Sequence, residues 1–261
     1  MKNNPMAKRV LGLGATLLSV ACWILLWALL AHLLDIEVFF PGPIKTVKAL
    51  LNLVITIDFW KTVALSMIRI ILGMILGVVI GVLLAFACRI LPFVKRFVTI
   101  GMTVVKSTPV ASIVLILWVI VAQSIGSANL PIIIALLMVA PIIWQNLMDG
   151  FDSIDPQLVE VATVFEFPFA KRLRLIVLPS LLKFFIPAFI TSIGLSWKSG
   201  IAAEIIAYTK SSIGRHILDA KSTFDGDVML AWTIVVVLLS LLFEFIAKML
   251  LRRYMSNAKT H

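Results

Sequence analysis

Six long apolar runs dominate the pattern of hydrophobic and polar positions along the 261-residue chain. About 20 consecutive apolar residues in a helix suffice to cross the hydrocarbon core of a membrane. The pattern therefore predicts an all-α integral membrane protein that forms a single transmembrane domain over residues 1–261. Its six transmembrane helices are expected at approximately residues 10–34, 62–88, 97–122, 130–148, 184–206 and 228–251.

The first run begins as a secretory signal peptide does, with Lys2, Lys8 and Arg9 ahead of apolar residues. Residues 10–34 then contain no Asp, Glu, Lys or Arg. The apolar core of a signal peptide is only about 7–15 residues long. The length of this run therefore favours a first membrane helix.

Composition and charge agree with a membrane protein and add its orientation. The chain is 61% hydrophobic and 14% charged, too few polar residues to cover a soluble domain. Fourteen of the 23 Lys and Arg residues lie in 2–9, 89–96, 171–183 and 248–259, against six in 35–61, 123–129 and 207–227. The positive-inside rule places both termini and the loop 149–183 in the cytoplasm. The net charge is +10, but no basic, aromatic-rich patch exists outside the apolar runs, so no nucleic-acid partner is expected.

Small residues recur at every fourth position of the second run, at Gly73, Gly77, Gly81 and Ala85. This spacing places them on one helix face, where another helix can approach closely. Arg69 lies one turn earlier on that face and is expected to point toward protein. The neighbouring helix belongs either to the same chain or to a second copy of it.

The third run is interrupted near its middle by Lys106-Ser107-Thr108-Pro109. Proline removes a helical hydrogen bond and disfavours helical geometry at the residue before it. A broken helix at membrane depth is tolerated where it is buried in protein or lines a water-filled cavity. The break indicates either a translocation pathway or a structural kink.

The loop 149–183 carries charges and prolines between two apolar runs. Ser153 or Asp155 is a candidate N-cap, and Pro156 suits the first position of a helix that runs to about Phe165. Pro168 then interrupts the helix, and a second helical stretch follows. The three aromatic residues at this turn either dock a soluble partner or pack against the bundle or the membrane interface: Phe165, Phe167 and Phe169.

This loop resembles the signature loop of the permeases of ATP-binding-cassette importers. Glu160-Val161-Ala162 and Ile176-Val177-Leu178-Pro179 stand at the family spacing, with Glu166 in place of the family's glycine. The chain is similar in particular to the nitrate, sulfonate, taurine and thiamine-precursor group, over about residues 20–253. Further matches to that group are Phe40-Pro41-Gly42-Pro43, Asp155-Pro156-Gln157-Leu158-Val159-Glu160 and Trp197-Lys198-Ser199-Gly200-Ile201-Ala202-Ala203-Glu204.

The resemblance implies that the loop is a coupling element that inserts into a groove on a separate ATPase subunit. A left-handed backbone at Glu166 would cost about 1–2 kcal/mol, so its turn is expected to be strained or built differently. The resemblance also implies two ATPase subunits that bind ATP and Mg, a solute-binding protein, a second permease copy in a homodimer, and a bacterial cytoplasmic membrane. The coupling residues implied are Glu160, Ala162, Phe165, Glu166, Phe167, Pro168, Phe169, Leu178 and Pro179.

Charged residues within the predicted spans are candidates for the pathway because burying charge is costly. Arg69, Lys106 and Lys198 outnumber the one acid Glu204, once Glu244 and Lys248 are set aside as a structural pair. An excess of positive charge favours an anionic or zwitterionic solute. The alternative is that these cations extend to the interface or pair across helices. The candidate pathway residues are Arg69, Lys106, Ser107, Thr108, Pro109, Ser196, Lys198, Ser199 and Glu204.

These observations predict a permease subunit for a small sulfonate-, taurine- or nitrate-like solute. An importer of a thiamine or pyrimidine precursor is the alternative within the class. A stand-alone secondary carrier would show matching broken helices in its two halves, and only one break is visible. A membrane enzyme would need clustered ionisable residues, whereas the three histidines are scattered, so neither catalysis nor a metal site is expected. The chain has no phosphate-binding glycine loop, so it is expected to bind no cofactor itself.

Overall fold

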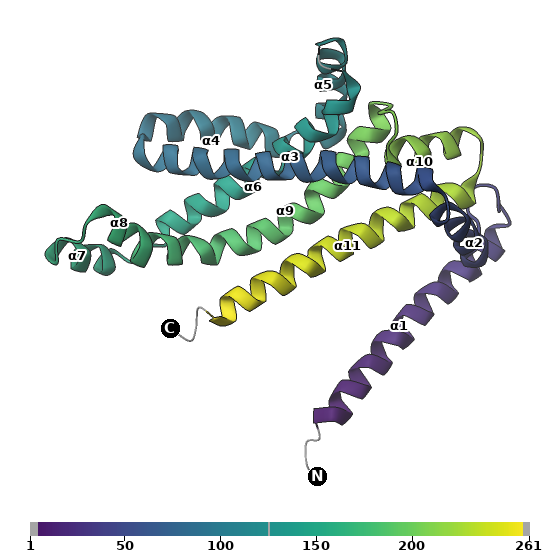
Figure 1. The fold of residues 1–261 in the computed structure, drawn as a ribbon, viewed down its shortest axis with the longest axis horizontal. Coiled ribbons are helices and arrows are strands. Elements are labelled where there is room, and N and C mark those ends of the chain that lie inside the picture. The colour runs from purple at the N-terminus through teal and green to yellow at the C-terminus, as the bar shows by residue number, and fades with distance from the viewer. Residues whose placement is uncertain (1–4, 125, 258–261) are drawn as a thin grey trace. The chain divides into compact units, whose positions relative to one another are not determined.

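The computed structural model describes the backbone of residues 5–124 and 126–257, and the side chains of residues 14–120 and 126–251. Over these residues the chain is helical and contains no strand (Figure 1). The basic clusters predicted at 2–9 and 248–259 lie partly outside this range. The helices are α1 (Pro5–Leu34), α2 (Pro43–Val54), α3 (Ile57–Ile90), α4 (Pro92–Ser107), α5 (Val110–Ser124), η1 (Ser127–Asn129), α6 (Leu130–Asp152), α7 (Pro156–Val164), α8 (Phe169–Arg172), η2 (Leu173–Val177), α9 (Leu178–Ile206), α10 (Ile213–Ser222) and α11 (Gly226–Asn257).

Five helical segments are long and apolar enough to cross a membrane, which confirms the predicted all-α membrane fold. The remaining predicted span, 97–122, is a pair of helices, α4 and α5, that meet at an angle of 105°. The continuous segments are Gly14–Leu34, Ile57–Ile90, Ser127–Asp152, Phe169–Ile206 and Gly226–Leu251.

The bend between α4 and α5 has a local cause. Thr108 adopts an extended backbone (φ −82°, ψ 130°), the conformation favoured before a proline. Pro109 has no N–H with which to continue the helix. The Thr108 hydroxyl donates to the carbonyl of Val104 at 2.7 Å, so a carbonyl at the end of α4 has a side-chain partner. The predicted break is therefore present, but it redirects the chain instead of interrupting one straight span.

The chain divides into two compact units, the first formed by residues 1–60 and 216–234. In this unit Trp232 stacks on Phe59 at 5.1 Å between ring centroids and on His216 at 4.9 Å. The amide of Gly226 donates to the carbonyl of Val38, which joins the start of α11 to the segment after α1. The Trp27 indole donates to the carbonyl of Pro41 at 3.1 Å.

The second unit comprises residues 61–215 and 235–261, and its core is built around α6. The predicted small-residue face of α3 packs against α6 of the same chain. A Cβ added at Gly73 would lie 2.4 Å from the Ile132 carbonyl oxygen, and one at Gly77 would lie 2.8 Å from the Val139 Cβ. Because α6 occupies this face, it serves packing within the chain and is closed to a second copy. Helices α6 and α9 also lie side by side (Figure 1).

Candidate functional site

The loop between α6 and α9 forms the predicted helix, turn and second helix. Asp155 is the N-cap of α7, and its carboxylate accepts a hydrogen bond from the Gln157 amide at 2.9 Å. Pro156 occupies the first turn, where its missing N–H costs nothing. The other candidate cap, Ser153, instead donates its hydroxyl to the carbonyl of Gly150 at 2.8 Å.

The turn at Glu166 has the geometry that its glycine position requires. Glu166 is left-handed, with φ of +49°. The Phe167 amide donates to the Ala162 carbonyl at 2.9 Å, and the Glu166 amide donates to the Thr163 carbonyl at 3.1 Å. These two bonds form a Schellman motif, which satisfies carbonyls left unpaired at the end of a helix. A glutamate therefore holds a conformation that usually needs glycine, and the turn is strained as expected.

Arg172 joins the two helices of the loop. Its guanidinium donates to the carbonyl of Phe167 at 3.1 Å and to the carbonyl of Ala162 at 3.3 Å. The Lys171 ammonium lies 3.9 Å from the centre of the Phe167 ring, a cation–π contact. Sequence reasoning missed the role of Arg172, because a basic residue in a basic segment carries no signal that it binds carbonyls across a turn.

The tip of the loop, defined as residues 164–169, presents apolar side chains to the outside. Val164, Phe165 and Phe169 are 78%, 70% and 79% exposed. Phe167 is only partly exposed, beneath Lys171. Exposed apolar clusters of this kind mark contact surfaces. The other residues predicted for coupling divide between a buried Ala162 and the exposed Glu160, Leu178 and Pro179.

Behind the tip lies a groove with a volume of about 700 Å³. Its charged lining residues include Glu160 and Arg172 from the loop and Arg89 from the end of α3. Phe86 and Phe151 add apolar surface, and their rings meet edge to face at 5.2 Å.

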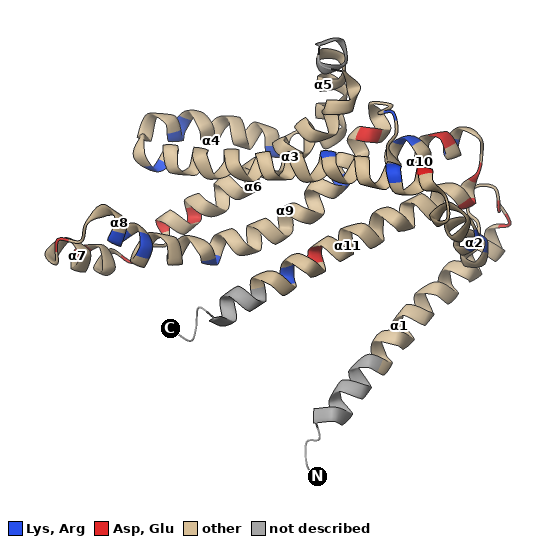
Figure 2. Cartoon of the chain, in the orientation of Figure 1, with Lys and Arg blue, Asp and Glu red and all other residues tan. Residues whose placement is uncertain are grey.

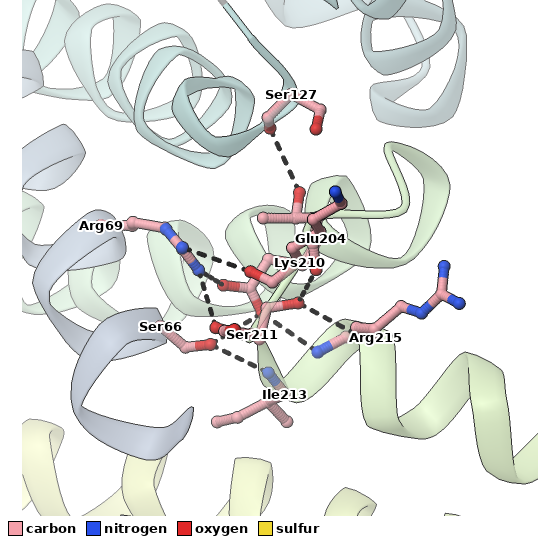
Figure 3. Close-up of polar contacts among 11 residues, drawn as sticks. Ser66, Arg69, Ser127, Glu204, Lys210, Ser211, Ile213 and Arg215 are labelled. Atoms are coloured by element: carbon pink, nitrogen blue, oxygen red, sulfur yellow. Dashed lines mark hydrogen bonds and ion pairs between the residues drawn. The ribbon is translucent and has the colours of Figure 1, made fainter. Parts of the chain in front are cut away.

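A second cluster brings together two of the predicted pathway residues, Arg69 and Glu204 (Figure 3). The Glu204 side chain is fully buried, and its Oε1 lies 3.8 Å from Nη1 of Arg69. Arg69 also donates to the carbonyls of Lys210 and Ser211, at 3.3 and 3.2 Å. Arg69 therefore pairs across helices, which the sequence left open as an alternative to a role in attracting the solute.

The remaining pathway candidates differ in exposure. The hydroxyls of Ser196 and Ser199 are buried and donate to carbonyls of their own helix, at 2.9 and 3.3 Å. Lys106 and Lys198 are exposed, and neither has a hydrogen bond or ion pair with any residue in the described part of the chain. Figure 2 shows few charged residues along the long helices. Ser107 is exposed beside Lys106, whereas Thr108 is partly buried.

Together these features define a multi-pass membrane protein with a helical loop that presents an apolar tip outside its spanning helices. The described residues contain no cluster of His, Cys, Asp or Glu suited to a metal ion. The family described as "Binding-protein-dependent transport system inner membrane component" matches residues 77–256, more than half of the chain. The chain belongs to this family. Its members are transport permease subunits of ABC importers and not enzymes, and the family implies ATPase partner subunits.

Two curated proteins are similar in sequence. The chain is 24% identical over 257 residues to the taurine transport system permease protein TauC of Escherichia coli (strain K12), covering 95% of this chain and 90% of that protein. It is 25% identical over 111 residues to a protein named as the aliphatic sulfonates transport permease SsuC, from Bacillus subtilis (strain 168). That second match covers 42% of this chain and only 40% of the relative.

Solved structures of transporters share the fold. A chain of a bacterial ABC transporter involved in the import of the acidic polysaccharide alginate superposes with a TM-score of 0.62 at 18% identity, covering 94% of this chain and 96% of that one. A chain of an amino acid ABC transporter superposes with a TM-score of 0.62 at 16% identity, covering 75% and 93%.

Proposed function

We propose that the chain is the membrane subunit of an ATP-driven importer for a small sulfonate- or taurine-like solute. Family membership supports the transport role, and the names of the two curated relatives support this class of solute. The observation that carries the charge preference is Lys198, an exposed ammonium on a spanning helix with no partner among the described residues. A lone cation at membrane depth is expensive unless it faces water, an anion or another protein.

In this proposal the tip 164–169 is the contact with the ATPase. Its exposed Val164, Phe165 and Phe169 provide the apolar surface, and Arg172 and the Schellman motif keep that surface in one shape. Two copies of the chain form the pathway, two ATPase subunits lie below it, and a solute-binding protein delivers the solute from outside. The complex resides in the bacterial cytoplasmic membrane.

The preference for an anion is tested by uptake into liposomes that contain the permease, its ATPase and saturating binding protein. At about 4 Å a charge pair is worth roughly 1 kcal/mol in water and about 4 kcal/mol at an effective dielectric constant of 20. We therefore expect Lys198→Met to reduce taurine or alkanesulfonate uptake by about ten-fold, and Lys106→Met to reduce it less.

Lys183→Met is the matched control, because Lys183 is an exposed cation on the same helix near the coupling loop. Taurine or alkanesulfonate uptake with the Lys183→Met variant should equal uptake with the unmodified protein. Unchanged maximal uptake and half-saturation in both the Lys106 and the Lys198 variants would refute the charge preference. Preferred uptake of a neutral pyrimidine precursor would replace the proposed solute class.

A further inference from the structure

The C-terminal end of α9, which lies away from the coupling loop, carries a buried carboxylate that joins three segments. Glu204 lies two residues before the end of α9. Its Oε2 accepts hydrogen bonds from the Ser66 hydroxyl of α3 at 3.0 Å and from the Gly214 amide of α10 at 3.1 Å. The Ser66 oxygen in turn accepts from the Ile213 amide at 3.0 Å. One side chain from α9 and one from α3 thus bind the first two amides of α10 (Figure 3).

The first residues of α10, 213–215, are held closely against the end of α9. The first amides of a helix have no partner within the helix, and a negative charge there is favourable. The third of these amides, that of Arg215, donates a hydrogen bond to the Ser212 hydroxyl oxygen at 3.0 Å. A Cβ at Gly214 would lie 2.4 Å from the Glu204 Cβ, so α10 begins in direct contact with α9.

Arg69 holds the connection between the two helices from the side of α3. It binds the carbonyls of Lys210 and Ser211, which follow a left-handed Tyr208 at the end of α9. Oε1 of Glu204 has no hydrogen bond with any described residue, and the Arg69 guanidinium is the charge beside it. A buried charge left unpaired is strongly destabilising, so the carboxylate, Ser66 and Arg69 form one interdependent unit. We call Ser66, Arg69, Glu204 and Gly214 the α3–α9–α10 joint.

A continuous helical segment links this joint to the coupling loop. Helix α8, the π-helical turn η2 and α9 follow one another without a break from Phe169 to Ile206, a segment of 38 residues. At 1.5 Å per residue this segment is roughly 57 Å long. Phe169, at one end, belongs to the exposed tip, and Glu204, at the other, belongs to the joint.

We propose that the α3–α9–α10 joint makes residues 207–215 a rigid extension of α9 and α3, so that displacement of the coupling loop moves this segment. Glu204 is then a positioning residue for transport, and it acts by fixing the far segment instead of contacting the solute. This inference rests on the proposed function, because it assigns an output to the ATPase-driven movement.

The test compares Glu204→Gln and Ser66→Ala with Glu244→Gln in the reconstituted complex. Glu244 is a matched control, since its carboxylate pairs with Lys248 on the surface of α11 and has no part in the joint. Uptake and ATP hydrolysis are measured on the same liposomes, and amide hydrogen exchange is followed over residues 207–216. We expect both joint variants to lower uptake per ATP hydrolysed by about ten-fold, with hydrolysis within two-fold of the unmodified complex. Exchange of the Ile213 and Gly214 amides should become at least ten-fold faster. The control, Glu244→Gln, should change neither the uptake per ATP hydrolysed nor this exchange.

An unchanged ratio of uptake to hydrolysis in both joint variants would overturn the inference, as would a parallel loss of uptake and hydrolysis. Ser66→Ala removes only one hydroxyl, so it keeps the test decisive if Glu204→Gln fails to fold. Absence of ATP-driven uptake by the unmodified complex would contradict the proposed function itself, which separates the two failures.

Discussion

Replacing Glu166 by glycine should stabilise the turn of the coupling loop. The left-handed backbone at Glu166, with φ of +49°, costs a non-glycine residue about 1–2 kcal/mol. Glycine removes that cost but adds about 0.4–1 kcal/mol of chain entropy to the open state. The net gain is about 1 kcal/mol, equivalent to roughly five-fold less local opening. The Glu166 side chain has no hydrogen bond or ion pair with a described residue, so the substitution removes no contact of this kind.

Amide hydrogen exchange of the loop measures this opening directly. The Phe167 amide is the reporter, because it donates to the Ala162 carbonyl in the motif that closes α7. In Glu166→Gly we expect its exchange to be roughly five-fold slower. Glu166→Ala keeps the backbone cost and should exchange as the unmodified chain does.

Glu160→Gly provides a control of opposite sign. Glu160 is exposed within α7, where glycine lowers helix stability by roughly 0.5–1 kcal/mol. Exchange at Phe167 should therefore accelerate. If Glu166→Gly also accelerated exchange, or if Glu166→Ala slowed it as much as glycine does, backbone strain at Glu166 would be the wrong explanation.

Two further predictions concern packing and the loop. Gly73→Ala places a Cβ 2.4 Å from a carbonyl oxygen of α6 and should reduce the yield of monodisperse protein in size-exclusion chromatography several-fold. Gly101→Ala is the control, because a Cβ there meets nothing within 4 Å, and it should leave the yield unchanged. Equal yields of the two variants would contradict the packing of α3 on α6. Arg172→Met removes two hydrogen bonds from a charged guanidinium to carbonyls, and a hydrogen bond of this kind is worth about 1.5–3 kcal/mol. It should therefore weaken co-purification with the ATPase at least ten-fold. Arg174 is exposed and has no such bond with a described residue, so Arg174→Met should leave co-purification unchanged. An equal loss in both variants would indicate a general effect of charge.

The features that the sequence predicts well are those that depend on neighbouring residues. The apolar runs locate the spanning helices, and the Asp155-Pro156 pair marks the start of α7. The turn at Glu166 was indicated instead by the resemblance of the loop to the family's signature loop. The first two depend on helix periodicity or on backbone preferences within a few positions. The break at Pro109 is of the same kind, although its angle of 105° depends on how α5 packs and has no local signal.

The features that sequence reasoning missed depend on contacts between distant residues. Ser66 meets Glu204 across 138 positions, and Gly214 is required only because α10 begins against α9. The sequence identified Arg69 and Glu204 as costly intramembrane charges and as candidates for a solute pathway, and it left pairing across helices open as the alternative. Their pairing became visible only once the packing of α3 and α9 brought them together. The same holds for the small-residue face of α3, whose neighbouring helix was undetermined until α6 was seen against it.

The central claim is that this chain imports an anionic or zwitterionic solute only when an ATPase drives it. Uptake of labelled taurine or an alkanesulfonate into liposomes, measured with and without ATP and with and without the ATPase subunits and binding protein, tests it most directly. The proposal predicts uptake only when the permease, the ATPase, the binding protein and ATP are all present. Uptake by the chain alone, driven by an ion gradient without any ATPase, would contradict it.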